Sequence, residues 1–276
     1  MLFRSVVRPL LGLVRACHPE PTAAVTLAAA LLALPGHSAG RVLLVTATVL
    51  ASQLAVGWSN DAIDAPRDAA VGRTDKPIPA GTVSRRVVAV ASLGAALATV
   101  ALALLSGRAA VAAIVGLVSA LAYNWPLKST VASVLPYAVS FAALPAFVVL
   151  ARGARPPGWL LAAGALLGAG AHFANTLPDL ADDARTGVRG LPHRLGPVGS
   201  QVVAAVLLLA ATAALAFGPP GPPSWPGLAG FAGAAVVLPI GGYTASRRTG
   251  SRAAFRAVLV VALVDVVLLV LAGRTL

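Results

Sequence analysis

Long apolar runs, separated by short breaks, constrain the fold of this chain more than any other feature. Nine runs are predicted to span a membrane, at about 20–36, 41–60, 86–106, 109–123, 130–151, 157–180, 199–217, 226–244 and 253–273. A membrane-spanning helix needs roughly 20 apolar residues, and with 58% hydrophobic and 11% charged residues the composition excludes an ordinary soluble or disordered protein. Backbone groups in lipid must bond to one another, and these runs lack the alternation of barrel strands. The sequence therefore predicts an all-α membrane protein.

The basic residues predict the orientation of this bundle. The net charge is +12, and with nine spans all but five of the 21 Lys and Arg residues fall on the side of the N-terminus, the exceptions being Arg41, Arg108, Arg152, Arg155 and Arg274. The side rich in Lys and Arg is expected to be cytoplasmic. We therefore expect a cell-membrane protein with its N-terminus in the cytoplasm and its C-terminus outside. Because the basic residues lie in the gaps between spans, they favour lipid head groups as partners and argue against nucleic acid.

Two units are expected along the chain. Residues 1–19 combine apolar residues with Arg4, Arg8 and Arg15, which indicates a helix lying at the membrane interface. Residues 20–276 are expected to form the nine-helix domain.

The acidic residues are concentrated at the ends of two predicted spans. Seven of the nine lie within 61–75 and 179–183, each segment at the cytoplasmic end of a long apolar run. Because like charges repel and ions are unfavourable near hydrocarbon, two such groups call for a cation. The alternative is a pair of solvated loops whose acids offset nearby Arg and Lys, but such loops would intersperse the two signs.

The first acidic segment reads NDAIDAPRD at 60–68. Asp61, Asp64 and Asp68 have the i, i+3, i+7 spacing of one helix face. Because Pro66 disfavours a regular helix around residue 62, the motif is expected to straddle the end of the helix.

The second acidic segment reads NTLPDLADD at 175–183. Asn175, Asp179, Asp182 and Asp183 are expected to share a helix face, with His172 one turn earlier on the same stripe. Carboxylate and amide oxygens suit Mg²⁺, which also keeps waters and phosphate oxygens as ligands, and no His or Cys spacing indicates zinc. The predicted metal ligands are Asp61, Asp64, Asp68, Asp179 and Asp183.

Basic residues follow each acidic segment, in GRTDKPIPAG at 72–81 and ARTGVRGLPHRLG at 184–196. Arg binds phosphate oxygens through paired N–H groups and Lys acts as a point charge, so these residues are candidates for a diphosphate site. Lipid head groups are the alternative partner for each one singly. A third polar segment, YNWPLKST at 123–130, is predicted on the same side. The predicted substrate-binding residues are Asn60, Arg67, Arg73, Lys76, Tyr123, Asn124, Lys128, His172, Asn175 and Arg194.

Together these motifs resemble the UbiA superfamily of intramembrane aromatic prenyltransferases. The two segments match its NDxxDxxxD and DxxxD signatures through Asn60, Asp61, Asp64, Asp68, Asp179 and Asp183. The resemblance covers nearly the whole chain and implies nine transmembrane helices around a central cavity. It also implies Mg²⁺ bridging an isoprenyl diphosphate to both motifs, and transfer of the isoprenyl group to an aromatic or other small acceptor with release of diphosphate. The expected catalytic residues are Asp61, Asp64 and Asp182, the last as acceptor of the released proton.

Two further functions stay open beside this transfer reaction. The branch of the family that uses 4-hydroxybenzoate carries Arg-Pro near its first span, whereas this chain has His18-Pro19 followed by Glu20, which does not favour an aromatic carboxylate. A UbiA-type terpene cyclase acting on its own prenyl diphosphate is one alternative. A cation-coupled transporter is the other, favoured by intramembrane acids such as Asp265, although most acids lie at one membrane face and no inverted repeat with broken midplane helices is evident.

Overall fold

The computed structural model describes residues 2–247 and 253–273, and its regular elements are helices throughout these ranges. The first six α-helices are α1 (Leu2–Ala16), α2 (Pro19–Ala33), α3 (Ala39–Ala70), α4 (Arg85–Leu104), α5 (Ala110–Asn124) and α6 (Val134–Ala151). The remaining five are α7 (Gly158–Thr176), α8 (Leu180–Arg185), α9 (Leu191–Phe217), α10 (Trp225–Arg247) and α11 (Ala253–Ala272). Short 3₁₀ turns at Gly107–Ala109, Leu127–Ser129 and Val131–Ser133 join them.

Seven helices in the described ranges are long and apolar enough to cross a membrane, where the sequence predicted nine spans. They are α3, α4, α5 with the 3₁₀ turn before it, α6, α9, α10 and α11. The first expected span is instead α2, whose 15 residues rise about 22 Å and fall short of a hydrocarbon core of roughly 30 Å. The sixth is α7, whose apolar run contains His172, Asn175 and several glycines.

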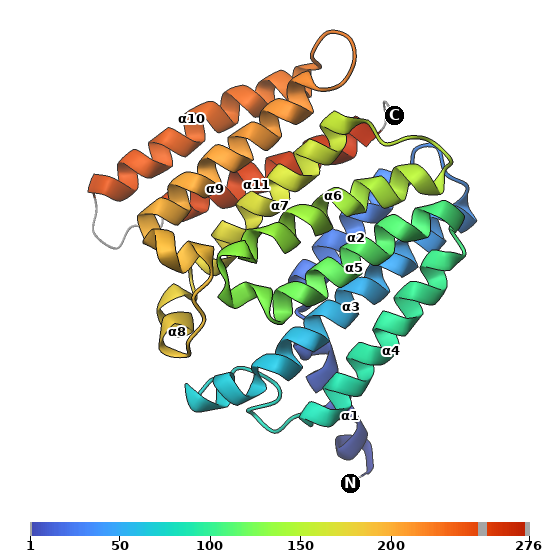
Figure 1. The fold of residues 1–276 in the computed structure, drawn as a ribbon, viewed down its shortest axis with the longest axis vertical. Coiled ribbons are helices and arrows are strands. Elements are labelled where there is room, and N and C mark those ends of the chain that lie inside the picture. The colour runs from blue at the N-terminus through green and yellow to red at the C-terminus, as the bar shows by residue number, and fades with distance from the viewer. Residues whose placement is uncertain (1, 248–252, 274–276) are drawn as a thin grey trace.

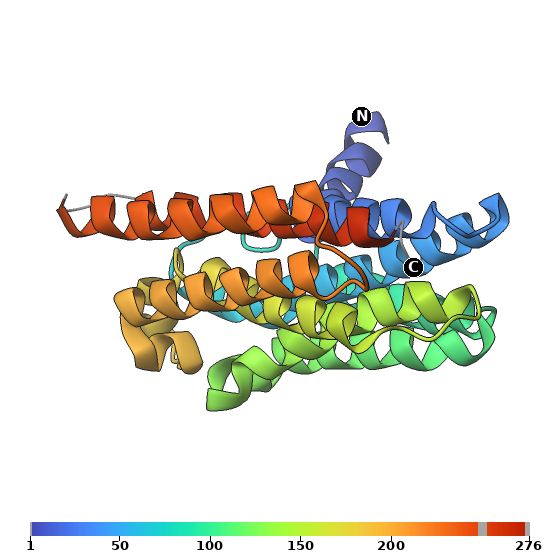
Figure 2. The ribbon, with the colours of Figure 1, turned by 90° about the horizontal axis from the view of Figure 1, so that it is seen from above.

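The long helices lie side by side and return on themselves (Figure 1). Successive helices pack against each other from α2 to α7, α9 packs on α7, and α11 contacts α9, α7 and α2. Seen from above, α10 and α11 lie on the opposite side of the molecule from α5 and α6 (Figure 2). The largest apolar cluster joins α7, α9, α10 and α11, and a second one joins α2, α3 and α6.

A buried acid connects two of these helices in the interior. The Asp265 side chain of α11 is fully buried, and its Oδ1 lies 2.6 Å from the Thr212 hydroxyl of α9. A carboxyl group in such surroundings is tolerated only with a polar partner. The structure therefore assigns Asp265 a contact between helices, away from the acidic segments.

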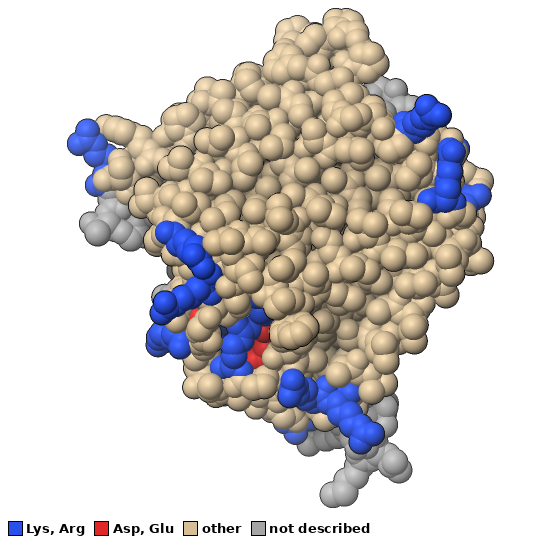
Figure 3. Space-filling model, viewed as in Figure 1, with Lys and Arg blue, Asp and Glu red and all other residues tan. Residues whose placement is uncertain are grey.

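One end of the bundle carries α1, the C-terminal end of α3 and α8, whereas the α2–α3 connection lies at the other end (Figure 1). Figure 3 shows the molecule from the same side as Figure 1, with Lys and Arg gathered at opposite edges and an uncharged surface between them. Acidic side chains are visible within the basic group near α8. Large apolar side chains such as Leu43, Leu97 and Val206 are exposed on this body. Such an apolar surface is expected where a helical bundle faces lipid.

Candidate active site

The first acidic motif lies inside α3, because the helix continues through Pro66 to Ala70. The expectation that the motif straddles the helix end was therefore wrong. Pro66 has no N–H to donate to the carbonyl of Ala62, four residues earlier. The Arg85 side chain replaces it, since its Nε donates to the Ala62 oxygen at 2.7 Å. A donor supplied by the start of α4 thus lets α3 carry Asp61, Asp64 and Asp68 in one helical register.

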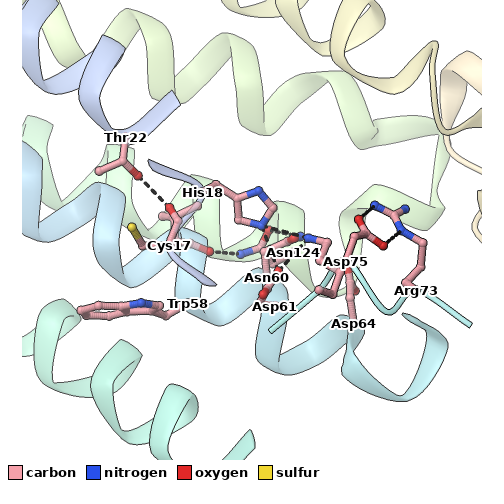
Figure 4. A network of polar contacts seen from close by, with 12 residues as sticks. Cys17, His18, Thr22, Trp58, Asn60, Asp61, Asp64, Arg73, Asp75 and Asn124 are labelled. Carbon is pink, nitrogen blue, oxygen red and sulfur yellow. Dashed lines mark hydrogen bonds and ion pairs between the residues drawn. The ribbon is translucent and has the colours of Figure 1, made fainter. Parts of the chain in front are cut away.

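Asp61 is the most enclosed of these acids, with 2% of its side chain exposed. Its Oδ1 accepts hydrogen bonds from Lys76 Nζ at 2.8 Å and from His18 Nε2 at 3.0 Å. Figure 4 shows His18 reaching Asp61 from the turn before α2. The charge of Lys76 offsets a carboxylate that water scarcely reaches.

Asp64 lies one turn further along α3 and is paired with two cations. Its Oδ1 accepts from Arg67 on the same helix and from Lys128 in the 3₁₀ turn after α5. Burial lowers the pKa of Lys128 below its usual value, although the Asp64 carboxylate opposes that shift. The third polar segment therefore lies beside the first acidic motif.

A pair of asparagines joins α3 to α5 at the same level. Asn60 Nδ2 donates to Asn124 Oδ1 at 3.3 Å, and Asn124 Nδ2 donates to the Val56 carbonyl at 2.9 Å (Figure 4). Asn124 is almost fully buried, so these bonds satisfy an amide that would otherwise be costly.

The basic segment after α3 connects the two acidic segments. Arg73 binds both carboxylate oxygens of Asp75 at 3.0 Å, which raises the pKa of Arg73 and lowers that of Asp75. The charge of Arg73 also interacts with those of Asp68 on α3 and Asp179 before α8. A cation of the first segment therefore lies within electrostatic reach of the second.

The second acidic segment does not form one continuous helix face, contrary to expectation. Helix α7 ends at Thr176, a turn follows, and the short α8 begins after Asp179. Pro178 in that turn has no N–H with which to continue the helical ladder. Asn175 therefore belongs to α7, whereas Asp182 and Asp183 belong to α8.

Asp183 also lies within electrostatic reach of the first segment. Its Oδ2 lies 3.5 Å from His193 Nε2, and the charges of Arg67 and Lys128 act on it. Burial raises the pKa of Asp183 above its usual value, with His193 opposing the shift. The charges of Arg67 and Lys128 thus act on both Asp64 and Asp183.

Three other predicted residues in and after this segment are more exposed than Asp183. Asp182 pairs with Arg185 at 2.5 Å and its side chain is 45% exposed. Arg194 and Asp179 are exposed, and neither makes an ion pair within the described ranges.

An aromatic cluster lies beside the site, between α5, α6 and α7. The ring centroids of Tyr123 and Tyr137 are 4.9 Å apart, and that of His172 lies 5.5 and 5.0 Å from them. His172 Nε2 lies 3.0 Å from the Ser133 hydroxyl, which also accepts from the Leu191 N–H. Asn175 Nδ2 donates to Tyr137 Oη at 3.1 Å. The predicted residues Tyr123, His172 and Asn175 therefore belong to one cluster.

A small cavity of about 60 Å³ lies between α3, α4, α5 and α6. Ser52 and Gln53 line it together with Phe147 and several alanines. Gln53 is two helical turns before Asn60 on α3. The cavity therefore lies farther from the site end of the bundle than the asparagine pair does, toward the middle of α3.

The donor set fits Mg²⁺ held partly by a substrate. Among the described residues, no three His, Cys, Asp or Glu side chains converge closely enough to hold an ion by themselves. Mg²⁺ is usually bound by one or two carboxylates together with waters and substrate phosphates. Carboxylates on two segments, with Lys and Arg charges acting on both, suit a metal ion shared between protein and substrate phosphate better than a closed protein cage would.

Sequence reasoning did not select three residues that contact the site: His18, Ser133 and His193. His18 and His193 precede or follow the acidic motifs by many residues and reach them only through the fold. The signal available for His18 was its place beside Pro19 at the start of the first predicted span. Ser133 carried no signal, because a lone Ser at a helix start is ordinary.

Known proteins match this chain both in sequence pattern and in fold. The model of the UbiA prenyltransferase family matches residues 22–264. A UbiA homolog from Archaeoglobus fulgidus solved with GPP and Mg²⁺ has a TM-score of 0.72 at 15% identity, with 96% of this chain and 100% of that chain covered. The apo structure of a UbiA homolog from Aeropyrum pernix K1 has a TM-score of 0.70 at 20% identity, with 92% and 98% covered.

A third solved structure, described as a digeranylgeranylglyceryl phosphate synthase, has a TM-score of 0.69 at 14% identity, with 97% and 99% covered. No curated protein matches the sequence significantly. The solved structures establish the shared fold, and the family model, which spans most of the sequence, establishes the family. The chain belongs to the UbiA prenyltransferase family.

Proposed function

We propose that this protein transfers an isoprenyl group from an isoprenyl diphosphate to a small acceptor and releases diphosphate, with Mg²⁺ as cofactor. The observation that carries the proposal is the pairing of Asp64 with Lys128 and Arg67, two cations whose charges also act on Asp183 of the second acidic segment, at one end of an apolar bundle. The Archaeoglobus homolog bound to GPP and Mg²⁺ supports the same ligands for this chain.

The chain's own cations hold the leaving diphosphate in this proposal. Breaking the allylic carbon–oxygen bond places the electron pair, and with it negative charge, on the diphosphate. Bound Mg²⁺ would supply Lewis-acid stabilisation of that charge. Arg67, Lys76 and Lys128 already donate to carboxylates of the first acidic motif, and their further N–H groups can donate to phosphate oxygens.

The aromatic cluster stabilises the carbon side of the broken bond. Tyr123, Tyr137 and His172 present ring faces and edges beside the diphosphate site, and the electron-rich faces of aromatic rings attract a cation. The acceptor carbon then forms the new bond and loses a proton. Asp182 is the proposed acceptor of that proton.

The proposal extends to the membrane. Nine helices, α2 to α7 and α9 to α11, are proposed to span the bilayer around a central cavity, with α2 and α7 shielded from lipid by their neighbours. The site end is proposed to face the cytoplasm, because most Lys and Arg residues lie there.

Diphosphate release tests the proposal directly. The purified protein, with Mg²⁺ and isoprenyl diphosphates of 5 to about 20 carbons, is incubated with and without a panel of phenolic, quinone-precursor and glycerol-phosphate acceptors. Release that requires an acceptor supports transfer. Release without any acceptor, accompanied by a cyclic hydrocarbon, supports the cyclase, and no release under any condition contradicts both enzymes and favours transport.

A further inference from the structure

His18 stands in an unusual backbone conformation at the start of α2. Its φ of 55° and ψ of 71° lie in the left-handed region, and it is the one non-glycine residue with positive φ in the described ranges. Such a conformation is uncommon for residues other than glycine, and it persists where the surrounding structure holds it in place. Contacts with the surrounding structure are therefore expected to hold His18 in this conformation.

The turn that carries His18 is pressed onto α3. Gly57 of α3 approaches Cys17 so closely that an added Cβ would lie 2.7 Å from its carbonyl carbon. One residue further, Trp58 Nε1 donates to the Leu13 carbonyl of α1 at 2.8 Å. Asp61 lies one turn after Gly57 on the same helix face, so the turn lies directly over the first metal-binding position.

The imidazole of His18 closes over Asp61. The His18 side chain is 36% exposed, whereas that of Asp61 is 2% exposed. His18 Nε2 lies 3.0 Å from Asp61 Oδ1 and 3.4 Å from Lys76 Nζ. The shorter contact identifies Nε2–H as a donor to the carboxylate. Lys76 approaches the same oxygen, so both partners hold Oδ1 and leave Oδ2 for another ligand.

We propose that His18 is a positioning residue, which fixes the rotation of the Asp61 carboxylate so that Oδ2 faces the metal and diphosphate. The inference rests on the proposed function, in which Asp61 binds Mg²⁺. Partners that orient metal-binding carboxylates typically contribute about 10- to 100-fold in metal affinity or activity. His18 does not touch substrate in this scheme; it acts through Asp61.

Metal binding by the full-length protein tests the proposal without reference to catalysis. Mn²⁺ is used as the probe, and its binding is measured by electron paramagnetic resonance in the presence of inorganic diphosphate. His18→Gly suits the left-handed backbone but removes the donor, and its affinity is expected to fall about 10- to 100-fold. His18→Gln keeps an N–H donor of similar reach and is expected to recover most of the affinity.

Two further variants keep the test decisive. His18→Asn also tolerates the backbone but its amide is too short to reach Asp61, so it is expected to bind as weakly as His18→Gly. His37 lies in the connection before α3 and contacts the Val148 carbonyl. The start of α3 is about 33 Å along the helix from Asp61, so His37→Gly is the matched control with unchanged binding.

Kinetics adds a readout that a purely structural role would not move. The Mg²⁺ concentration for half-maximal rate is expected to rise in His18→Gly, with kcat largely recovered at saturating Mg²⁺. Wild-type Mn²⁺ affinity in both His18→Gly and His18→Asn would overturn the proposal. Loss of Mn²⁺ affinity in a protein that releases no diphosphate would refute the prenyl-transfer function while leaving the role of His18 intact.

Discussion

Replacing Gly57 by alanine tests whether the turn before α2 must lie against α3. The added Cβ would meet the Cys17 carbonyl carbon at 2.7 Å and the carbonyl oxygen at a still shorter distance, whereas ordinary contact begins at 3.4 Å. The turn must therefore retreat by at least about 0.7 Å. Both groups are backbone, and neither can rotate away as a side chain would. If the turn moves as a unit away from α3, the 3.0 Å contact between His18 and Asp61 lengthens to about 3.7 Å or more, which is beyond hydrogen-bond range.

The expected result for Gly57→Ala has two parts. Overpacking of this kind destabilises by about 1–3 kcal/mol, which thermal unfolding in detergent measures. Prenyl-transfer activity is expected to fall at least about tenfold, because misplacing a site by a fraction of an ångström weakens every interaction in it. Gly94→Ala in α4 is the matched control, since nothing lies within 4 Å of its added Cβ and alanine is the better helix former. Unchanged stability, metal binding and activity in Gly57→Ala would refute the reasoning.

Three other predictions follow from the same structure. Asp64→Asn is expected to abolish turnover while circular dichroism shows that the protein stays folded, because Mg²⁺ coordination tolerates a lost carboxylate poorly. Glu20→Gln, at an exposed position, is the control. Near-normal turnover in Asp64→Asn would remove this acid from the mechanism. Arg85→Ala is expected to destabilise by about 1–3 kcal/mol by leaving the Ala62 carbonyl without its side-chain donor. The loss is expected to shrink in a Pro66→Ala background, which restores the backbone N–H, and equal losses in the two backgrounds would show that Arg85 does not replace that donor. Reporter fusions after positions 70 and 190 are expected to read cytoplasmic, and a signal from outside at either point would contradict the shared site.

Local sequence was sufficient to predict the helical membrane class and the residue types of the site. Apolar runs must form helices in lipid whatever their neighbours, because the backbone has no other hydrogen-bond partner there. Carboxylates and amides at span ends indicated an oxygen-ligand metal and a phosphate substrate for the same local reason. The pairing of Asp64 with Lys128, across 64 positions, was foreshadowed only by their shared membrane side.

The two proline-containing motifs show where local reasoning ends. Pro66 and Pro178 remove the same backbone donor, yet α3 continues through the first and α7 ends before the second. The two motifs differ in whether a side chain replaces the missing donor. The Arg85 guanidinium donates to the Ala62 carbonyl, which Pro66 leaves free. The corresponding carbonyl for Pro178 is that of Ala174, and no side chain in the described ranges donates to it.

Local sequence indicated the acids, the amides and most cations of the candidate site, whereas the packing of the helices sets their geometry and brings His18 and His193 to the acids. His18 reaches Asp61 across 43 positions because Gly57 lets the turn before α2 lie against α3, a contact that no local pattern encodes. Helix formation depends on neighbours three and four residues away, which a sequence displays directly. The orientation of a carboxylate depends on whichever donors the packing of other helices brings within about 3 Å, and only the folded chain specifies those.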